Sequence, residues 1–197
     1  MATQFSMLQI INAALVSQGQ YSVSSNDGSD EWVLLSRNWP SIVEAELEDG
    51  AYMFAKRQEE LLTRVDGKFG MPDGYAVPLD ALHVRRLWTE EANGDRNFPD
   101  WTQDGSHVYV DAPDGCFVEI VEVATEDLWS ANFSRGVQKR LEAIILRAIK
   151  EESGDAARAD QEAENHFERA RTASSKSRSP APPYREGLLS RARFRRG

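Results

Sequence analysis

Apolar residues recur at helical spacing in the last third of the chain. Between positions 133 and 148, large apolar side chains return every three or four residues, which places them on one face of a helix. We expect Thr125 to cap this helix, because Glu126 and Asp127 then place negative charge in its first turn. The pattern breaks at residues 153–155 and resumes beyond them. The sequence therefore predicts two long helices here.

The second of these helices differs from the first because its apolar positions, Phe167 apart, are all alanines. A helix with so narrow an apolar face buries little surface against its own domain. We therefore expect it to pack against a neighbouring copy of the chain rather than its own core, and to fray in the monomer.

The N-terminal quarter carries a weaker helical pattern. Residues 5–16 read as a short amphipathic helix, and Ser29 or Asp30 can cap a second one. The Trp39-Pro40 step disfavours helix at Trp39 but suits Pro40 as a first helical residue. We therefore expect a third helix to begin at Pro40.

Residues 51–124 show a different sequence pattern, in which five Asp-Gly or Asn-Gly dipeptides separate runs typical of β-strands. The run 116–123 is apolar on both faces, which predicts a central strand. Residues 57–64 have helix-forming types but follow a glycine and precede hairpins, and we assign them to a strand. The other strand-like runs are 75–78, 81–88 and 108–111.

These patterns predict an α+β fold: a helical bundle with an inserted small antiparallel β domain and an extended C-terminal arm. N-terminal helices of the bundle are expected in 1–50, the β-rich insertion in 51–124 and the long C-terminal helices in 125–173. A flexible linker rich in Ser and Pro, followed by the arm, is expected in 174–197.

Composition narrows the class of protein. An apolar fraction of 41% with five Trp among 197 residues is enough for a real core. No apolar run approaches a membrane span, and the first residues lack the order of a signal peptide, so we expect a protein made in the cytoplasm. The single cysteine, Cys116, excludes an internal disulfide and a cysteine-based zinc cluster, and its strand-like surroundings predict a buried thiol.

Charge is divided unequally between the body and the tail. Residues 176–197 carry seven Lys and Arg against one Glu, a net charge of +6, so the rest of a chain that totals −9 carries −15. This asymmetry predicts an interaction arm on an acidic body. An acidic body does not suit a domain that grips nucleic acid, because phosphate binding is driven by clustered cations.

The tail supports three interpretations: a solubilising end, a nucleic-acid arm, or a peptide that folds onto a protein partner. Its apolar residues Tyr184, Leu188, Leu189 and Phe194 alternate with arginines. Each apolar side chain gains about 1.5–3 kcal/mol when buried in a protein groove and little along a DNA backbone. We therefore favour a protein partner.

Candidate chemistry is sparse. His83, His107 and His166 stand apart in the sequence, with no second ligand at metal-binding spacing, and no phosphate-binding loop, dinucleotide fingerprint or nucleophile elbow is present. We expect no metal, no cofactor and no enzymatic activity. The acidic cluster around Glu46 and Glu48 is the one alternative, because paired carboxylates can act as general acid and base. The tryptophans could stack on bases or sugars, but we expect them to anchor the core.

The order of these segments resembles one family. The quoted segments are IINAALVSQG, AYMFAKRQEELL, GYAVPLDALHVRRLW, FVEIVEV and GVQKRLEAIILRAI, with "GY-x-x-P-x-D-x-L" the most specific part. They resemble the tail tubular protein A-like head-to-tail adaptor (connector) proteins of tailed bacteriophages and gene transfer agents, over most of residues 7–175. The motif side chains look structural: Phe54, Ala55, Gly74, Tyr75, Pro78, Asp80 and Leu82 would form turns and the core of the sheet domain.

The resemblance implies a virion structural protein at the head–tail interface. Such an adaptor forms a ring, twelve copies in the family, between the portal protein and a stopper or tail protein, and DNA passes through its lumen without specific binding. It implies no membrane contact. The portal-binding arm would comprise Tyr184, Arg185, Leu188, Leu189, Arg191, Arg193, Phe194, Arg195 and Arg196. The stretch 97–104, which lacks the regular hairpin of many relatives, leaves the tail-docking face open.

Two alternatives remain at this stage. One is a regulatory nucleic-acid-binding protein that uses the Arg-rich tail, which salt-sensitive DNA binding would favour. The other is an enzyme that uses the carboxylates near Glu46.

Overall fold

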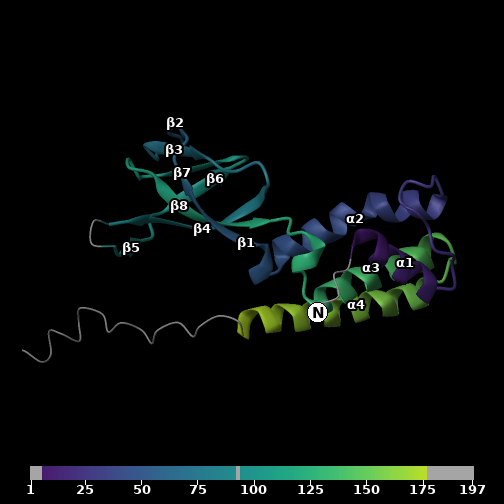
Figure 1. The fold of residues 1–197 in the computed structure, drawn as a ribbon. Coiled ribbons are helices and arrows are strands. Elements are labelled where there is room, and N and C mark those ends of the chain that lie inside the picture. Colours follow the sequence, from purple (N-terminus) through teal and green to yellow (C-terminus); the bar gives the residue numbers. More distant parts are fainter. Residues whose placement is uncertain (1–5, 92–93, 177–197) are drawn as a thin grey trace, which may run out of the picture.

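The computed structural model describes residues 6–91 and 94–176, in which four α-helices flank two small antiparallel sheets (Figure 1). The α+β class and the inserted position of the β domain are therefore confirmed. No helix in these residues is both long and apolar enough to cross a membrane. The helices are α1 (Met7–Ser17), α2 (Asp30–Asp49), α3 (Ala131–Ala148) and α4 (Ser153–Lys176), with 3-10 turns η1 (Met53–Ala55) and η2 (Glu126–Leu128).

The β domain places its most apolar strand in the middle of a sheet. One sheet has the order β1-β8-β4-β5 and the other β2-β3-β7-β6, with every pairing antiparallel. The central position predicted for the last strand is confirmed in β8, and the strand assignment of residues 57–64 is confirmed in β1 and β2. The strands are β1 (Lys56–Leu61), β2 (Arg64–Asp66), β3 (Asp73–Ala76), β4 (Ala81–Glu90), β5 (Arg96–Asn97), β6 (Trp101–Asp104), β7 (His107–Val110) and β8 (Cys116–Glu122).

One local prediction in this domain was wrong. The Asp73-Gly74 pair lies within β3 rather than in a turn. Gly74 is needed there because a Cβ would lie 2.7 Å from Val65 Cγ2 and 3.0 Å from the Tyr109 ring. The stretch 97–104, for which no strand was proposed, contains β6, which pairs with β7.

Helix α2 runs unbroken through Pro40, so the prediction of two separate helices was wrong. Proline inside a helix costs about 3 kcal/mol, because it removes one hydrogen bond and crowds the preceding turn. A buried stripe with four-residue spacing along the whole helix offsets that cost, at about 1.5–3 kcal/mol for each large side chain. The stripe comprises Leu35, Trp39, Val43 and Leu47.

Helix α3 begins later than predicted. Thr125 precedes only the short turn η2, and its side chain makes no capping bond. Ser130 is the true cap, since its hydroxyl accepts a hydrogen bond from the Phe133 amide. The indole of Trp129 donates to the Ala124 carbonyl at 2.9 Å, which holds the chain in a turn before α3 starts.

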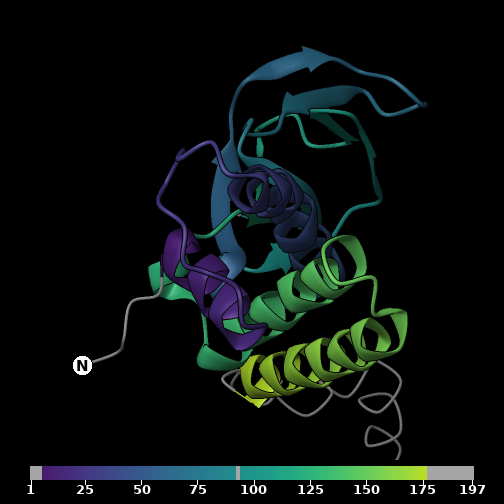
Figure 2. The ribbon, with the colours of Figure 1, turned by 90° about the vertical axis from the view of Figure 1, so that its right-hand side faces the viewer.

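Helix α4 packs on its own bundle, which corrects the prediction that it meets a neighbouring copy instead. It lies along α3 (Figure 2), and the members of its apolar stripe are all buried. Small side chains let the two helices approach closely, and Gly136 of α3 makes room for the one large residue. A Cβ on Gly136 would lie 2.5 Å from the Phe167 ring. The stripe comprises Ala156, Ala159, Ala163, Phe167 and Ala170.

Helix α4 also extends to Lys176, past the linker boundary expected at residue 174. Ser174 explains the extension, because its hydroxyl accepts from the Met53 amide at 2.7 Å and donates to the Ala51 carbonyl at 3.3 Å. The C-terminal end of α4 is thus attached to the segment that leads into β1, and it lies on the β-domain side of the bundle (Figure 1).

The bundle core is centred on Phe133, which is fully buried. Its ring meets four others edge-on, with centroids 4.7–5.6 Å apart, a geometry in which aromatic pairs attract beyond simple burial. The four partners are Tyr52, Phe54, Trp129 and Phe167, contributed by the η1 region, η2 and α4. Trp39 also stacks on Trp129 at 5.6 Å, so these two tryptophans anchor the core as predicted.

Candidate functional site

The predicted portal-binding residues lie outside the described residues. They are Tyr184, Arg185, Leu188, Leu189, Arg191, Arg193, Phe194, Arg195 and Arg196. The surfaces that could serve an interaction must therefore be sought on the bundle and the β domain.

Several motif residues have structural contacts in the β domain. Buried Tyr75 donates its hydroxyl hydrogen to the Ala112 carbonyl and accepts from the Gly115 amide at 3.1 Å. Asp80 accepts two hydrogen bonds from the Arg57 guanidinium, at 3.0 and 3.1 Å, and these bonds lower the pKa of Asp80. The Pro78 carbonyl accepts from Ala81 at the start of β4. These contacts fix turns and strand ends.

Three other motif residues lie elsewhere than predicted. Phe54, Ala55 and Leu82 were expected in the turns or core of the sheet domain, yet all three pack in or against the helical core. The reason is topological: η1 and the start of β4 lie where the two parts of the molecule meet, next to Val121 and Ala124. A periodicity cannot reveal which of two adjoining cores an apolar residue enters.

The acidic cluster on α2 does not form a catalytic pair. Glu46 is buried, whereas Glu48 is exposed, because residues two apart on a helix do not face each other. Arg171 of α4 grips Glu46 with Nε and Nη2, which lie 3.1 and 2.9 Å from Oε1, and the Tyr52 hydroxyl donates to the same oxygen. Glu164 receives the other arm of Arg171 at 2.9 Å.

Burial governs the protonation of this group. It raises the pKa of Glu46, although the hydrogen bonds from Tyr52 and Arg171 oppose that rise. Burial, with the neighbouring Glu46 carboxylate, also raises the pKa of the Tyr52 phenol, so Tyr52 remains a neutral donor. The free-energy cost of removing these charges from water thus offsets much of the electrostatic attraction between Glu46 and Arg171. The pair mainly fixes how α4 lies against α2.

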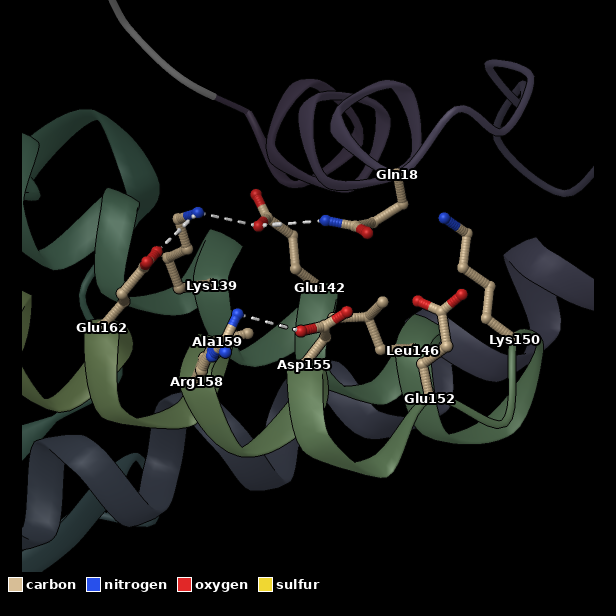
Figure 3. A pocket seen from close by; sticks show the side chains of 10 residues that line it. All are labelled: Gln18, Lys139, Glu142, Leu146, Lys150, Glu152, Asp155, Arg158, Ala159 and Glu162. Carbon is tan, nitrogen blue, oxygen red and sulfur yellow. Dashed lines mark hydrogen bonds and ion pairs between the residues drawn. The ribbon is translucent and has the colours of Figure 1, made fainter.

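A polar hollow of about 370 Å³ lies where α1, α3 and α4 meet (Figure 3). Buried Glu142 accepts a hydrogen bond from Gln18, the residue that follows α1, at 3.4 Å and another from Lys139 at 2.9 Å. Lys139 also contacts Glu162 of α4 at 2.8 Å, and this hydrogen bond lowers the pKa of Glu162. The hollow therefore holds a hydrogen-bond chain that joins three helices, and these partners are already engaged with one another.

The remaining reactive groups are dispersed. Burial raises the pKa of the Cys116 thiol to about 12, so it is a structural residue as predicted. His83, His107 and His166 lie on β4, β7 and α4. Among residues 6–91 and 94–176, no three His, Cys, Asp or Glu side chains are grouped so that they could hold a metal ion.

The β domain exposes a surface that sequence reasoning missed. One hollow of about 350 Å³ is lined by the carboxylates Glu60, Glu90, Asp111 and Asp114, and no Lys or Arg is among the described residues that line it. An adjoining hollow of about 270 Å³ shares Glu60 and contains Leu62 and Leu79. We call these six residues the acidic–apolar surface.

Only tertiary structure assembles this surface. Its carboxylates come from β1, the end of β4 and the β7–β8 loop. Three of the four sit in or beside turn segments, where acidic residues are usual, so nothing in the sequence distinguished them.

Comparison with known proteins adds no assignment: no protein-family model matches this sequence, and no curated protein is significantly similar to it.

Proposed function

We propose that the chain is a non-enzymatic structural protein of a virion: an adaptor ring that joins the portal to the tail. The observation that supports this most is the layout of helices α1 and α2, an inserted β domain, then α3 and α4. The same layout is implied by the resemblance of segments in residues 7–175 to the tail tubular protein A-like adaptors.

The charge distribution is compatible with this function. A body with a net charge of −15 suits a channel wall past which DNA must slide, because like charges repel and adhesion is avoided. Within the bundle, α4 is already buried against α3, so copies in a ring would meet through other faces than the alanine stripe.

The function can be tested by removing the arm in the producing host. Because α4 and its anchor at Ser174 precede the arm, truncation after Pro183 should leave the fold intact. Electron micrographs should then show filled heads without tails, whereas the full-length chain restores complete particles. Complete particles at normal yield from the truncated protein would contradict the proposal.

Matched variants separate burial from charge in the arm. Replacing Leu188, Leu189 and Phe194 together by Ser should be nearly as damaging as truncation, because apolar burial supplies most of the anchoring. Replacing the arm's arginines by Lys should be milder and should make attachment more salt-sensitive, because Lys keeps the charge but not the bidentate geometry.

The nucleic-acid alternative has a separate outcome. Purified full-length protein should bind duplex DNA weakly at physiological salt, since the acidic body opposes the basic tail. Tight binding that weakens steeply with salt, together with normal particles from the truncated chain, would favour a nucleic-acid-binding regulator instead.

A further inference from the structure

The acidic–apolar surface has unmet binding capacity. All four of its carboxylates belong to exposed residues, and none of them takes part in the ion pairs found among the described residues. Two cations lie beside the hollow and are engaged elsewhere. Arg64 reaches the Pro113 carbonyl at 3.5 Å but is paired with Asp73, and Arg96, opposite Glu90 in the β4–β5 pairing, lies over the Trp88 ring at 4.6 Å. Beside them, Leu62 and Leu79 are 68% and 98% exposed. Like charges in one hollow repel, so a cation placed there would relieve that repulsion.

The chemistry of the surface specifies the kind of ligand that it fits. Arginine binds carboxylates through a planar fork of donors, and leucine-lined hollows accept apolar side chains. Because the two hollows share Glu60, a short extended peptide with both residue types could occupy both at once. The same chain contains such a peptide.

We propose that residues 184–197 of the chain bind to the acidic–apolar surface of the same molecule. This segment carries five arginines against one glutamate, interleaved with Leu188, Leu189 and Phe194. Its charge is opposite to that of the acidic hollow, and its apolar residues match the leucine hollow. Another stretch that combines these two features, 135–150, lies in and just after helix α3 of the bundle.

The position of α4 favours binding within one molecule. Lys176, the last described residue, follows the anchor that Ser174 makes with the segment before β1, so the tail starts at the β-domain side of the bundle (Figure 1). The eleven residues 177–187 can span up to ~36–40 Å at about 3.3–3.6 Å each. A short tether also gives an effective concentration of about millimolar, which makes even weak docking significant.

Docking would regulate access to the arm. A partner that needs the free arm must displace it from the surface, so the partner's apparent affinity falls by the fraction that is docked. This inference goes beyond the adaptor function and does not depend on it, because the contact would form in the isolated chain whatever partner the arm later meets.

The test uses the full-length protein with a spin label attached at Ser190→Cys. Cys116 is fully buried and should stay unlabelled. We expect paramagnetic broadening of the backbone amide signals of residues 60–62 and 111–115, unchanged when the protein is diluted tenfold. Neutralising the hollow with Glu90→Gln, Asp111→Asn and Asp114→Asn should weaken docking about tenfold, because exposed ion pairs each contribute modestly.

Matched controls separate the effect of docking from that of net charge and from that of exposed hydrophobic side chains in general. The variant Glu44→Gln, Glu48→Gln, Glu168→Gln removes the same charge from exposed helical positions and should leave the broadening unchanged. Leu62→Ser with Leu79→Ser should reduce it, whereas Leu128→Ser, at a site 57% exposed in η2, should not. Absent broadening, broadening centred on the helices, equal loss in both charge variants, or disappearance on dilution would each overturn the proposal.

Discussion

The helical bundle and one face of the β domain use their polar and apolar groups differently. In the bundle, buried Glu142 and Glu46 have partners outside their own helices, in Gln18 and Arg171, and the large Phe167 of α4 is enclosed. In the β domain, the aliphatic core is closed, yet Leu62 and Leu79 are exposed beside four carboxylates that form no ion pair among the described residues. The carboxylates buried in the bundle thus stabilise helix packing, whereas those of the acidic–apolar surface are exposed to solvent.

Helix α4 was expected to contact another molecule, and in the structure it belongs to the bundle. An alanine-rich helix with many charges resembles a surface meant for another molecule, but here it closes the bundle. Its charges, among them Arg171 and Asp160, reach across to α2 and α3. We therefore expect substitutions along the α4 seam to alter stability, and substitutions on the acidic–apolar surface to alter binding alone.

The largest effect is expected at Phe167. Truncation by Phe167→Ala removes the one large side chain of the seam and leaves a cavity against Gly136, which should lower the free energy of unfolding by about 3–5 kcal/mol. Chemical denaturation followed by circular dichroism measures this change. Phe98→Ala, at a site 61% exposed, is the control and should stay within about 0.5 kcal/mol. Equal effects of the two variants would contradict the closed bundle.

The second effect concerns the buried ion pair. Arg171→Met leaves the Glu46 carboxylate buried without its cation, and because Arg171 is partly exposed we expect a loss of about 2–3 kcal/mol at pH 7.5. Removing the cation raises the pKa of Glu46 further, so protonation favours the folded state and the loss should shrink as the pH falls towards 5. Urea denaturation at both pH values measures it.

The control for this pair is Arg158→Met. Arg158 also lies on α4 but is 83% exposed in its ion pair with Asp155, and such pairs contribute little. Its variant should behave like the wild type at both pH values. A loss for Arg171→Met that grows at acidic pH would show that Glu46 is not the group left unpaired.

A smaller effect is expected at His166. Burial lowers the pKa of His166, and the positive charges of Arg169, Arg135 and Lys139 add to this against Glu162. As the pH falls, His166 is therefore protonated in the unfolded chain before it is protonated in the folded protein. The stability that neutral His166 contributes is complete above the ordinary histidine pKa of about 6.5 and declines below it. His166→Gln should therefore flatten the acid side of the profile of unfolding free energy against pH, which urea denaturation at a series of pH values measures.

The smallest effect is expected at the acidic–apolar surface. Leu79→Ser should change the free energy of unfolding by less than about 0.5 kcal/mol, because its side chain is almost wholly exposed. Thermal unfolding of this variant beside wild type measures the change. A loss above about 1 kcal/mol would show that Leu79 belongs to the folding core, and the distinction between the two regions would fail.

Much of the layout could be read from local sequence. Strands separated by Asp-Gly turns, the apolar run of β8 and the amphipathic faces of α1 and α3 all follow from residue spacing, because burial of one face is a local requirement. The arrangement of helices around an inserted β domain was predicted correctly on that basis. The interruption near residue 153 was also placed within a few residues of the observed break.

The errors share one physical origin, which is that distant residues decided the outcome. Pro40 stays inside α2 because the whole stripe from Leu35 to Leu47 is buried, a gain that the local Trp39-Pro40 step does not show. The end of α4 is set by the contact between Ser174 and Met53, two residues far apart in the chain.

By itself, the sequence determined the class of fold, the order of its elements and the opposition between an acidic body and a basic tail, since these depend on spacing and composition. Only the tertiary structure decided that α4 belongs to its own bundle, because that required a glycine on α3 opposite Phe167. Only it brought Glu60, Glu90, Asp111 and Asp114 into one hollow, because residues from three separate elements meet there through strand pairing that no local pattern encodes.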